Sequence, residues 1–306
     1  MKRTPVQASV TSSCGSIRMS FENNENLFDR LEDESVSIIL TDPPYKYLKN
    51  QKLEVDFDEK IFFDNCKRVL KKNGFIILFG RGVSFYRWNT ILDDLGFSFK
   101  EEIIWNKSMG TSPLMNICRI HETVSVFSKK TGIINKVKIP YLHSKNYDLN
   151  KIQSDFNRII GSLNNPNSLQ FLNDFLKQKR SDMELNTRFT KHKVTSDVRK
   201  TGAREVNTIA SIINGITEKT IIEELRDHYT SIHPTQKPVR LLERLLLLVK
   251  KSDNDIVLDP FGGSFSTMEA VYNLGLNGIT CELDLEYFEA GKNRILELTS
   301  QQRMLL

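Results

Sequence analysis

Apolar residues in the first 130 positions fall in short runs separated by polar and proline-rich turns. Residues 36–40 form a β-branched apolar run that ends in Thr41-Asp42-Pro43-Pro44-Tyr45, where two prolines disfavour both helix and strand pairing. Residues 61–70 have helical spacing, and Lys71-Lys72-Asn73-Gly74 separates them from a second apolar run at 75–79. The pattern predicts a strand with a rigid loop after it, then a helix and a second strand.

Two later segments extend this picture. Further runs at 101–105 and 123–127 predict strands, so the first half has a mostly parallel sheet with a late antiparallel portion. From residue 233 a helix at 239–249 leads to a βαβ unit, with strands at 256–258 and 278–281 and a helix at 267–274. We therefore predict an α/β fold built from two halves.

The middle of the chain, residues 131–230, interrupts the pattern. It is rich in Asn, Ser, Lys and Thr, with a predicted loop at 164–168, a helix at 169–179 and a basic stretch at 181–204. It holds 16 Lys and Arg against 11 Asp and Glu, so the chain's whole surplus of five positive charges lies there. A phosphate-contacting surface requires such a segment, although a solvated basic face would have the same composition. We predict three parts, at 1–130, 131–230 and 231–306.

Composition limits the class of protein. The chain has 306 residues and is 39% hydrophobic, which can fill a true core. Its longest apolar stretch, around 245–249, is well below the ~20 residues of a membrane span, and the N-terminus lacks the pattern of a signal peptide. The four cysteines are too widely spaced for a zinc site or a disulfide framework. We expect a cytoplasmic protein with reduced thiols.

A glycine-rich loop, Asp259-Pro260-Phe261-Gly262-Gly263-Ser264, lies between a predicted strand and a predicted helix. Glycines there let the backbone approach a ligand closely, although a structural turn would have the same appearance. Glu282 ends the next strand, where nucleoside-binding α/β folds carry an acid for ribose hydroxyls. Together the loop and the acid favour a nucleoside site.

The segment Asp42-Pro43-Pro44-Tyr45 holds a carboxylate and an aromatic ring on a stiff backbone. An amine conjugated to a base ring is a poor nucleophile because its lone pair is delocalised. If Asp42 and the Pro43 carbonyl accept its two hydrogens, the lone pair is localised for in-line attack on a sulfonium methyl group. Tyr45 would stack on a base that has left the duplex. The alternative is a surface turn after a strand.

The order of these motifs resembles that of the β group of DNA amino-methyltransferases. In that family the catalytic tetrapeptide precedes the cofactor loop, and a target-recognition module lies between them. Trp105-Asn106-Lys107, the segment 121–129 and the segment 233–238 also match family segments. The resemblance implies a Rossmann-like S-adenosylmethionine-dependent methyltransferase fold, with circularly permuted motif order and an inserted target-recognition module at 131–230.

The resemblance also assigns site residues. It implies that the catalytic residues are Asp42, Pro43, Pro44 and Tyr45. For the cofactor it implies Asp259, Pro260, Phe261 and Gly263 at the methionine and sulfonium part, Glu282 at the ribose, and Lys237 in the neighbouring pocket. The insert supplies the candidate DNA-binding residues Arg188, Lys191, Lys193, Arg199 and Lys200. Amine methylation needs no metal, so we expect structural roles for His121 and His233.

Two departures from the family pattern stand out. The family loop usually continues Gly-Ser-Gly-Thr, whereas this chain has Gly263-Ser264-Phe265-Ser266-Thr267. A phenylalanine in place of glycine needs room and a negative φ. An acid often found upstream of the catalytic strand is replaced by Asn23 or Asn24.

The leading hypothesis is site-specific methylation of adenine N6 in double-stranded DNA. Asp at position 42 favours adenine in this family, but the same geometry would serve cytosine N4. Glutamine side-chain methyltransferases usually carry Asn at this position. None of the four cysteines follows a proline, which argues against covalent methylation of a ring carbon. The alternative from another class is an inactive DNA-binding homologue in which Phe265 closes the cofactor pocket.

Partners follow from the same resemblance. Double-stranded DNA is the expected partner, with a homodimer and a cognate restriction enzyme as further expectations, and no membrane. A bacterial or phage-encoded protein would fit this description.

Overall fold

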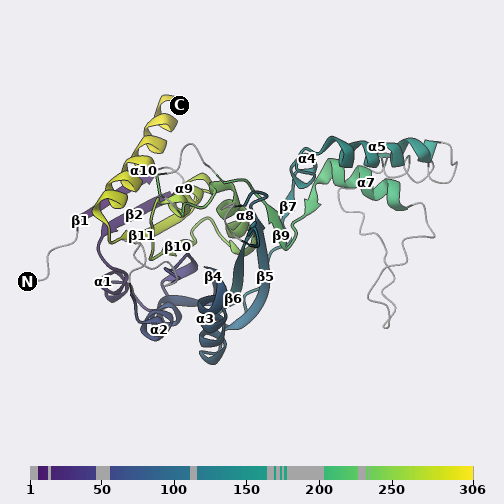
Figure 1. The fold of residues 1–306 in the computed structure, drawn as a ribbon. Coiled ribbons are helices and arrows are strands. Elements are labelled where there is room, and N and C mark those ends of the chain that lie inside the picture. The colour runs from purple at the N-terminus through teal and green to yellow at the C-terminus, as the bar shows by residue number, and fades with distance from the viewer. Residues whose placement is uncertain are drawn as a thin grey trace, which may run out of the picture. The chain divides into compact units, whose positions relative to one another are not determined.

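The computed structural model describes residues 6–12, 15–45, 56–110, 116–163, 169, 173, 176–177, 203–226, 232–233 and 235–305. The chain divides into two compact units (Figure 1). The first unit contains Met1–Asn135 and Thr220–Leu306, and the second contains Lys136–Lys219. The second unit is therefore shorter at both ends than the predicted insert.

A mixed sheet runs through the first unit. In the described residues it has nine strands, in the order β1-β2-β11-β10-β3-β4-β6-β5-β9 (Figure 1). They are β1 (Val6–Ser12), β2 (Gly15–Phe21), β3 (Val36–Thr41), β4 (Leu70–Gly80), β5 (Ser98–Asn106), β6 (His121–Ser128), β9 (Ile221–Glu223), β10 (Ile256–Asp259) and β11 (Asn277–Glu282). The strands from β2 to β4 pair in parallel, whereas β6 is antiparallel to both β4 and β5. The predicted parallel sheet with a late antiparallel portion is confirmed.

Helices lie against both faces of this sheet (Figure 1). One group is α1 (Asn24–Asp29), α2 (Glu59–Val69) and α3 (Gly82–Asp94), and the other is α8 (Val239–Val249), α9 (Ser266–Asn273) and α10 (Leu285–Leu305). Because both faces are covered, all six residues of β3 are buried, which explains its continuous apolar run. No helix in the described part of the chain is long and apolar enough to cross a membrane.

The N-terminal cap of α2 is set by its sequence. The Asp58 side chain accepts a hydrogen bond from the Ile61 amide at 2.9 Å, as an N-cap residue does. The strand predicted at 75–79 begins earlier than expected, because β4 starts at Leu70 directly after the helix. Leu70 pairs with Val36 of β3 across a register shift, so sheet pairing extends the strand through polar residues.

The strand order of the sheet reverses between the neighbouring strands β3 and β10. From β3 it passes through α2 to β4 on one side, and from β10 it passes through α9 to β11 on the other. Such a switch point opens a crevice at the carboxyl ends of the strands, where ligands bind in open α/β sheets. Asp42 follows β3, Asp259 ends β10 and Glu282 ends β11.

The second unit is mainly helical in its described part. It contains β7 (Lys138–Ile139), α4 (Tyr141–Ser144), α5 (Leu149–Leu163), α7 (Ala203–Asn214) and β8 (Ile216–Thr217). The Tyr141 hydroxyl donates to the buried Asp155 carboxylate at 2.9 Å and ties α4 to α5. Most of the predicted helix at 169–179 and nearly all of the basic stretch at 181–204 lie outside the described residues.

Candidate active site

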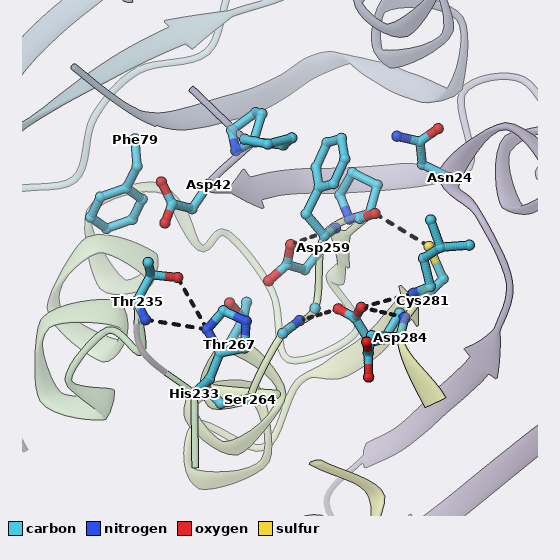
Figure 2. Close-up of a pocket in the computed structure, with 18 of the residues that line it drawn as sticks. Asn24, Asp42, Phe79, His233, Thr235, Asp259, Ser264, Thr267, Cys281 and Asp284 are labelled. Carbon is cyan, nitrogen blue, oxygen red and sulfur yellow. Dashed lines mark hydrogen bonds between the residues drawn. The ribbon is translucent and has the colours of Figure 1, made fainter. Parts of the chain in front are cut away.

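A cavity of about 480 Å³ lies in the first unit at the switch point. This volume is in the range of small-molecule and cofactor sites. Its lining includes every residue predicted to be catalytic or cofactor-binding: Asp42, Pro43, Pro44, Tyr45, Lys237, Asp259, Pro260, Phe261, Gly263 and Glu282. The fold therefore brings the tetrapeptide after β3 and the glycine-rich loop to one cavity. Asp42 and Asp259, one from each segment, are both visible there (Figure 2).

The Asp42 carboxylate is held through both of its oxygens. The Tyr45 hydroxyl donates to Oδ1, and the Lys237 ammonium donates to Oδ2. Burial raises the pKa of Asp42, and the positive charge of Lys237 opposes that rise. An ion pair with a lysine therefore favours the anionic, hydrogen-bond-accepting form of this acid.

The Pro-Pro-Tyr loop is attached to α3. The Ser84 hydroxyl donates to the Tyr45 carbonyl at 2.8 Å, and the centroid of the Tyr45 ring lies 6.0 Å from that of the buried Trp88. Sequence reasoning did not predict α3, so this support for the loop was missed.

Glu282 stabilises the glycine-rich loop. Its Oε2 accepts a hydrogen bond from the Gly263 amide at 2.8 Å, and its Oε1 accepts from the Leu283 and Asp284 amides at 2.9 and 2.8 Å (Figure 2). Gly263 has a φ of +53°, which favours glycine. At Gly262 a Cβ atom would lie 2.4 Å from the Thr280 hydroxyl oxygen, so the loop also needs glycine for close packing.

Burial makes the loop's acids weaker. It raises the pKa of Glu282, and it raises the pKa of Asp259 to about 7 even though the Thr267 hydroxyl and the Phe261 amide donate to it. Glu22 and Asp284 also line the cavity. This acidic wall suits a ligand with a positive charge and hydroxyl donors.

Phe265 has a different conformation from the one its sequence predicts. Its φ is +56°, so the expectation of a negative φ is wrong. The ring is fully buried beneath the loop, with its centroid 6.0 Å from that of Phe288, and a Cβ atom at Gly291 would lie 2.7 Å from it. Phe265 takes the left-handed conformation because the buried ring packs against these residues, and it is not among the residues that line the cavity.

Lys237 lines the cavity, and its ammonium forms ion pairs with two carboxylates. Besides Asp42, its Nζ atom lies 3.3 Å from Oε2 of Glu122. Its predicted contact with a cofactor stays a prediction.

His233 is a hydrogen-bonded residue of the cavity wall. Its Nδ1 accepts from the Thr235 amide at 3.3 Å, and its ring centroid lies 4.3 Å from that of Tyr287 (Figure 2). Burial, with a smaller effect of Lys237, lowers its pKa to about 4, so the ring is neutral near pH 7. His121, at the start of β6, is exposed.

Both upstream asparagines line the cavity, and Asn24 is visible in Figure 2. Asn23 is also the N-cap of α1, with its Oδ1 accepting from the Asn26 amide at 2.9 Å. Sequence reasoning missed Glu22, Phe57 and Asp284 as lining residues. A polar residue directly after a strand could have identified Glu22, but β2 itself was not predicted.

The candidate DNA-binding residues cannot be placed in this way. Arg188, Lys191, Lys193, Arg199 and Lys200 lie outside the described residues. Their role stays a prediction.

Comparison with known proteins places the chain among DNA-modifying enzymes. The Type II methyltransferase M.HpaI of Haemophilus parainfluenzae is 25% identical over 291 residues, which cover 91% of this chain and 74% of that protein. The Type II methyltransferase M.HinfI of Haemophilus influenzae is 26% identical over 295 residues, which cover 88% of this chain and 65% of that protein.

Solved structures share the fold. The complex of M1.HpyAVI with SAM superposes with a TM-score of 0.54 at 19% identity, covering 91% of this chain and 99% of that one. The cytosine-N4-specific PvuII DNA methyltransferase gives a TM-score of 0.55 at 15% identity, covering 90% and 85%. These likenesses confirm the predicted Rossmann-like methyltransferase fold. A family model described as DNA methylase matches residues 36–293, so the chain belongs to the N6-adenine and N4-cytosine DNA methyltransferase family.

Proposed function

We propose that the protein transfers a methyl group from S-adenosylmethionine to N6 of adenine at a specific site in double-stranded DNA. One observation carries the proposal. The tetrapeptide after β3 and the glycine-rich loop after β10 line the same cavity at the switch point of the sheet. A catalytic carboxylate and a cofactor loop must meet in this way for direct transfer.

The cavity has the features that this cofactor requires. Gly262 and Gly263 provide a backbone free of side chains, and Asp259 and Glu282 provide carboxylates for its ammonium and hydroxyl groups. Phe261 is a partly buried aromatic wall. When bound, S-adenosylmethionine supplies an electrophilic methyl group on a positively charged sulfur.

The residues after β3 would activate the amine. The Asp42 carboxylate and the Pro43 carbonyl accept its two hydrogens, which localises the nitrogen lone pair. A carbon–nitrogen bond then forms as the carbon–sulfur bond breaks, and Asp42 accepts the proton that the amine loses before releasing it to water. The Tyr45 hydroxyl donates to Oδ1 of Asp42, and because each carboxylate oxygen can accept two hydrogen bonds, Asp42 can receive the amine hydrogen at the same time.

Cytosine N4 is the second candidate acceptor. It has the same amine geometry, and the PvuII enzyme that shares the fold is named as cytosine-N4-specific. Asp at position 42 supports adenine through the family resemblance. The buried position of Phe265, beneath the loop, argues against the inactive homologue in which this ring closes the pocket.

Further partners belong to the proposal. The names of the two Type II relatives support a cognate restriction enzyme in the cytoplasm of a bacterium or of a phage-infected cell. We also propose a homodimer. Light scattering at micromolar concentration would contradict it by giving the monomer mass of 35.3 kDa.

Long-read sequencing of genomic DNA tests the reaction. Cells that express the wild-type chain should carry modified adenine at one motif, and cells that express Asp42→Ala should not. Asp64→Ala, which removes an exposed acid of α2, should retain the modification. Modified cytosine would favour the N4 alternative, and an unchanged signal in Asp42→Ala would contradict the catalytic assignment.

A further inference from the structure

Glu122 lies at the centre of a buried ion cluster behind Asp42. It is the second residue of β6, and its Oε1 lies 3.1 Å from Nζ of Lys107 and 3.7 Å from a guanidinium nitrogen of Arg226. Its Oε2 lies 3.3 Å from Nζ of Lys237. Glu122, Lys107 and Lys237 are all buried, so solvent does not screen these contacts effectively.

Lys237 joins this cluster to the catalytic loop. Its ammonium donates to Oδ2 of Asp42, faces Glu122 on another side, and lies 3.4 Å from the Thr235 carbonyl oxygen. Its Nζ atom is also 5.1 Å from the centroid of the Phe79 ring. The Asp42 and Thr235 oxygens accept hydrogen bonds from the ammonium and the Glu122 carboxylate adds an ion-pair contact, so protein groups define the position of Lys237.

Stability does not explain such a cluster. Burying several charges has a large desolvation penalty, and well-packed apolar residues of similar size often stabilise a protein as much or more. Charged groups buried beside a site that must hold a carboxylate in one orientation point to a functional role instead.

We propose that Glu122 is a positioning residue of methyl transfer, which holds the Lys237 ammonium against Asp42 and so fixes the direction in which the Asp42 carboxylate meets the amine. The inference rests on the proposed catalytic role of Asp42. Glu122 acts through Lys237 and does not touch the reacting atoms.

The electrostatics of the groups around Asp42 agree with this role. Burial disfavours ionised Glu122, yet Lys237 and Lys107 together lower the pKa of Glu122 to about 2. Asp42 is faced by Lys237, Glu122 and Tyr45, and Asp259 lies close enough to interact with it. Lys237 lowers the pKa of Asp42 and Glu122 raises it, so the two partners have opposite effects on the same acid.

Glu122→Gln tests the proposal because it removes the charge and keeps the shape. Methyl transfer to a duplex carrying the sequenced motif should show a kcat about tenfold or more below wild type, as expected when a reacting group loses its alignment. The KM for DNA and the calorimetric affinity for S-adenosylmethionine should stay within about twofold.

Glu224→Gln is the matched control. Glu224 has the same side-chain exposure, 10%, and pairs with Arg244 at 2.8 Å. Among the described residues, no ion pair joins Glu224 to Lys237 or to Asp42. This variant should keep the wild-type kcat.

The pH profile separates positioning from general damage. The acid limb is the part of the profile in which activity falls as the pH decreases. It should move to lower pH in Glu122→Gln, because Asp42 loses a neighbouring negative charge that raises its pKa. It should move to higher pH in Lys237→Met, because Asp42 loses its positive partner. If Glu122→Gln does not fold, Lys237→Met still tests the Lys237–Asp42 contact through which Glu122 is proposed to act, and an unmoved acid limb in that variant would overturn the inference.

Two results have distinct meanings. A Glu122→Gln kcat within about twofold of wild type with an unmoved acid limb, while Asp42→Ala is inactive, would overturn this inference and leave the proposed function intact. Wild-type activity in Asp42→Ala would overturn the proposed function itself.

Discussion

At the residue scale, burial has a large effect on Asp259, the acid at the start of the glycine-rich loop. Its carboxylate ends β10 and is buried, and burial raises its pKa from 3.8 to about 7. In the folded, ligand-free protein the Asp259 carboxyl is therefore mostly neutral at pH values below about 7. The contribution of this group to the free energy of unfolding is complete below pH 3.8 and is lost as the pH rises through about 7.

Asp259→Asn should remove this dependence. The ligand-free variant should lose less thermal stability than wild type between pH 5 and pH 8, as measured by the midpoint of thermal unfolding at pH values of about 5 and about 8. If Asp259 contacts the positively charged cofactor as proposed, binding favours the ionised acid, so the wild-type affinity for S-adenosylmethionine should increase from about pH 6 to about pH 8 and the variant's should not. Asp64→Asn, at an exposed position, should match wild type in both measurements. Equal pH slopes in Asp259→Asn and wild type would contradict the assignment.

Phe265 combines backbone strain with a buried ring. Its left-handed φ of +56° is unfavourable for a residue with a Cβ, but the ring fills space beside Gly291 and Phe288. Phe265→Ala should reduce the free energy of unfolding by about 3–5 kcal/mol. Phe265→Gly should be about 1 kcal/mol less harmful, because glycine adopts this φ without strain. Urea unfolding of both variants checks the order, and a glycine variant more stable than wild type would show that strain outweighs packing.

At the element scale, β9 shows how the sheet extends past the insert. Ile221–Glu223 pairs in parallel with β5, and the Trp105 indole donates to the Glu224 carbonyl at 2.8 Å. Three residues between polar neighbours give no period-2 signal, so the sequence pattern places this segment in the insert at 131–230. Pairing with a distant strand makes it part of the first unit.

Ile222 and Ile221 offer a direct test of that pairing. Their side chains lie on opposite faces of β9, with Ile222 fully buried and Ile221 56% exposed. Ile222→Ala should lower the free energy of unfolding by about 2–5 kcal/mol, and Ile221→Ala should change it by less than about 0.5 kcal/mol. Chemical denaturation measures both, and similar losses in the two variants would contradict the position of β9.

At the scale of the whole molecule, the charge surplus lies in 131–230, whereas the cavity lies in the first unit. Phosphate contacts determine affinity and its salt dependence, and the reaction requires the groups that line the cavity. We therefore expect the two properties to be separable by mutation.

Neutralising Lys191, Lys193, Arg199 and Lys200 together should weaken DNA binding. If each contacts a phosphate, the slope of log K against log salt should become less steep by up to about 3.6. The affinity for S-adenosylmethionine, measured by calorimetry, should not change. An unchanged salt slope would remove this segment from the DNA interface.

The sequence by itself identified the family and the strands and helices next to its motifs. The family is confirmed by the match over 36–293. These features are local: prolines limit the backbone at 43–44, a continuous apolar run marks β3, and apolar periodicity marks α8. Spacing in one dimension was enough to interpret them.

Tertiary structure decided what no local pattern encodes. The φ of Phe265 depends on the space beside Gly291 and Phe288, the start of β4 depends on pairing with Val36, and the contact of Lys237 with Asp42 and Glu122 joins three distant segments. Each outcome depends on which neighbour a residue meets after folding. Packing, strand pairing and burial of charge are long-range interactions, and for this reason the structure was needed to determine them.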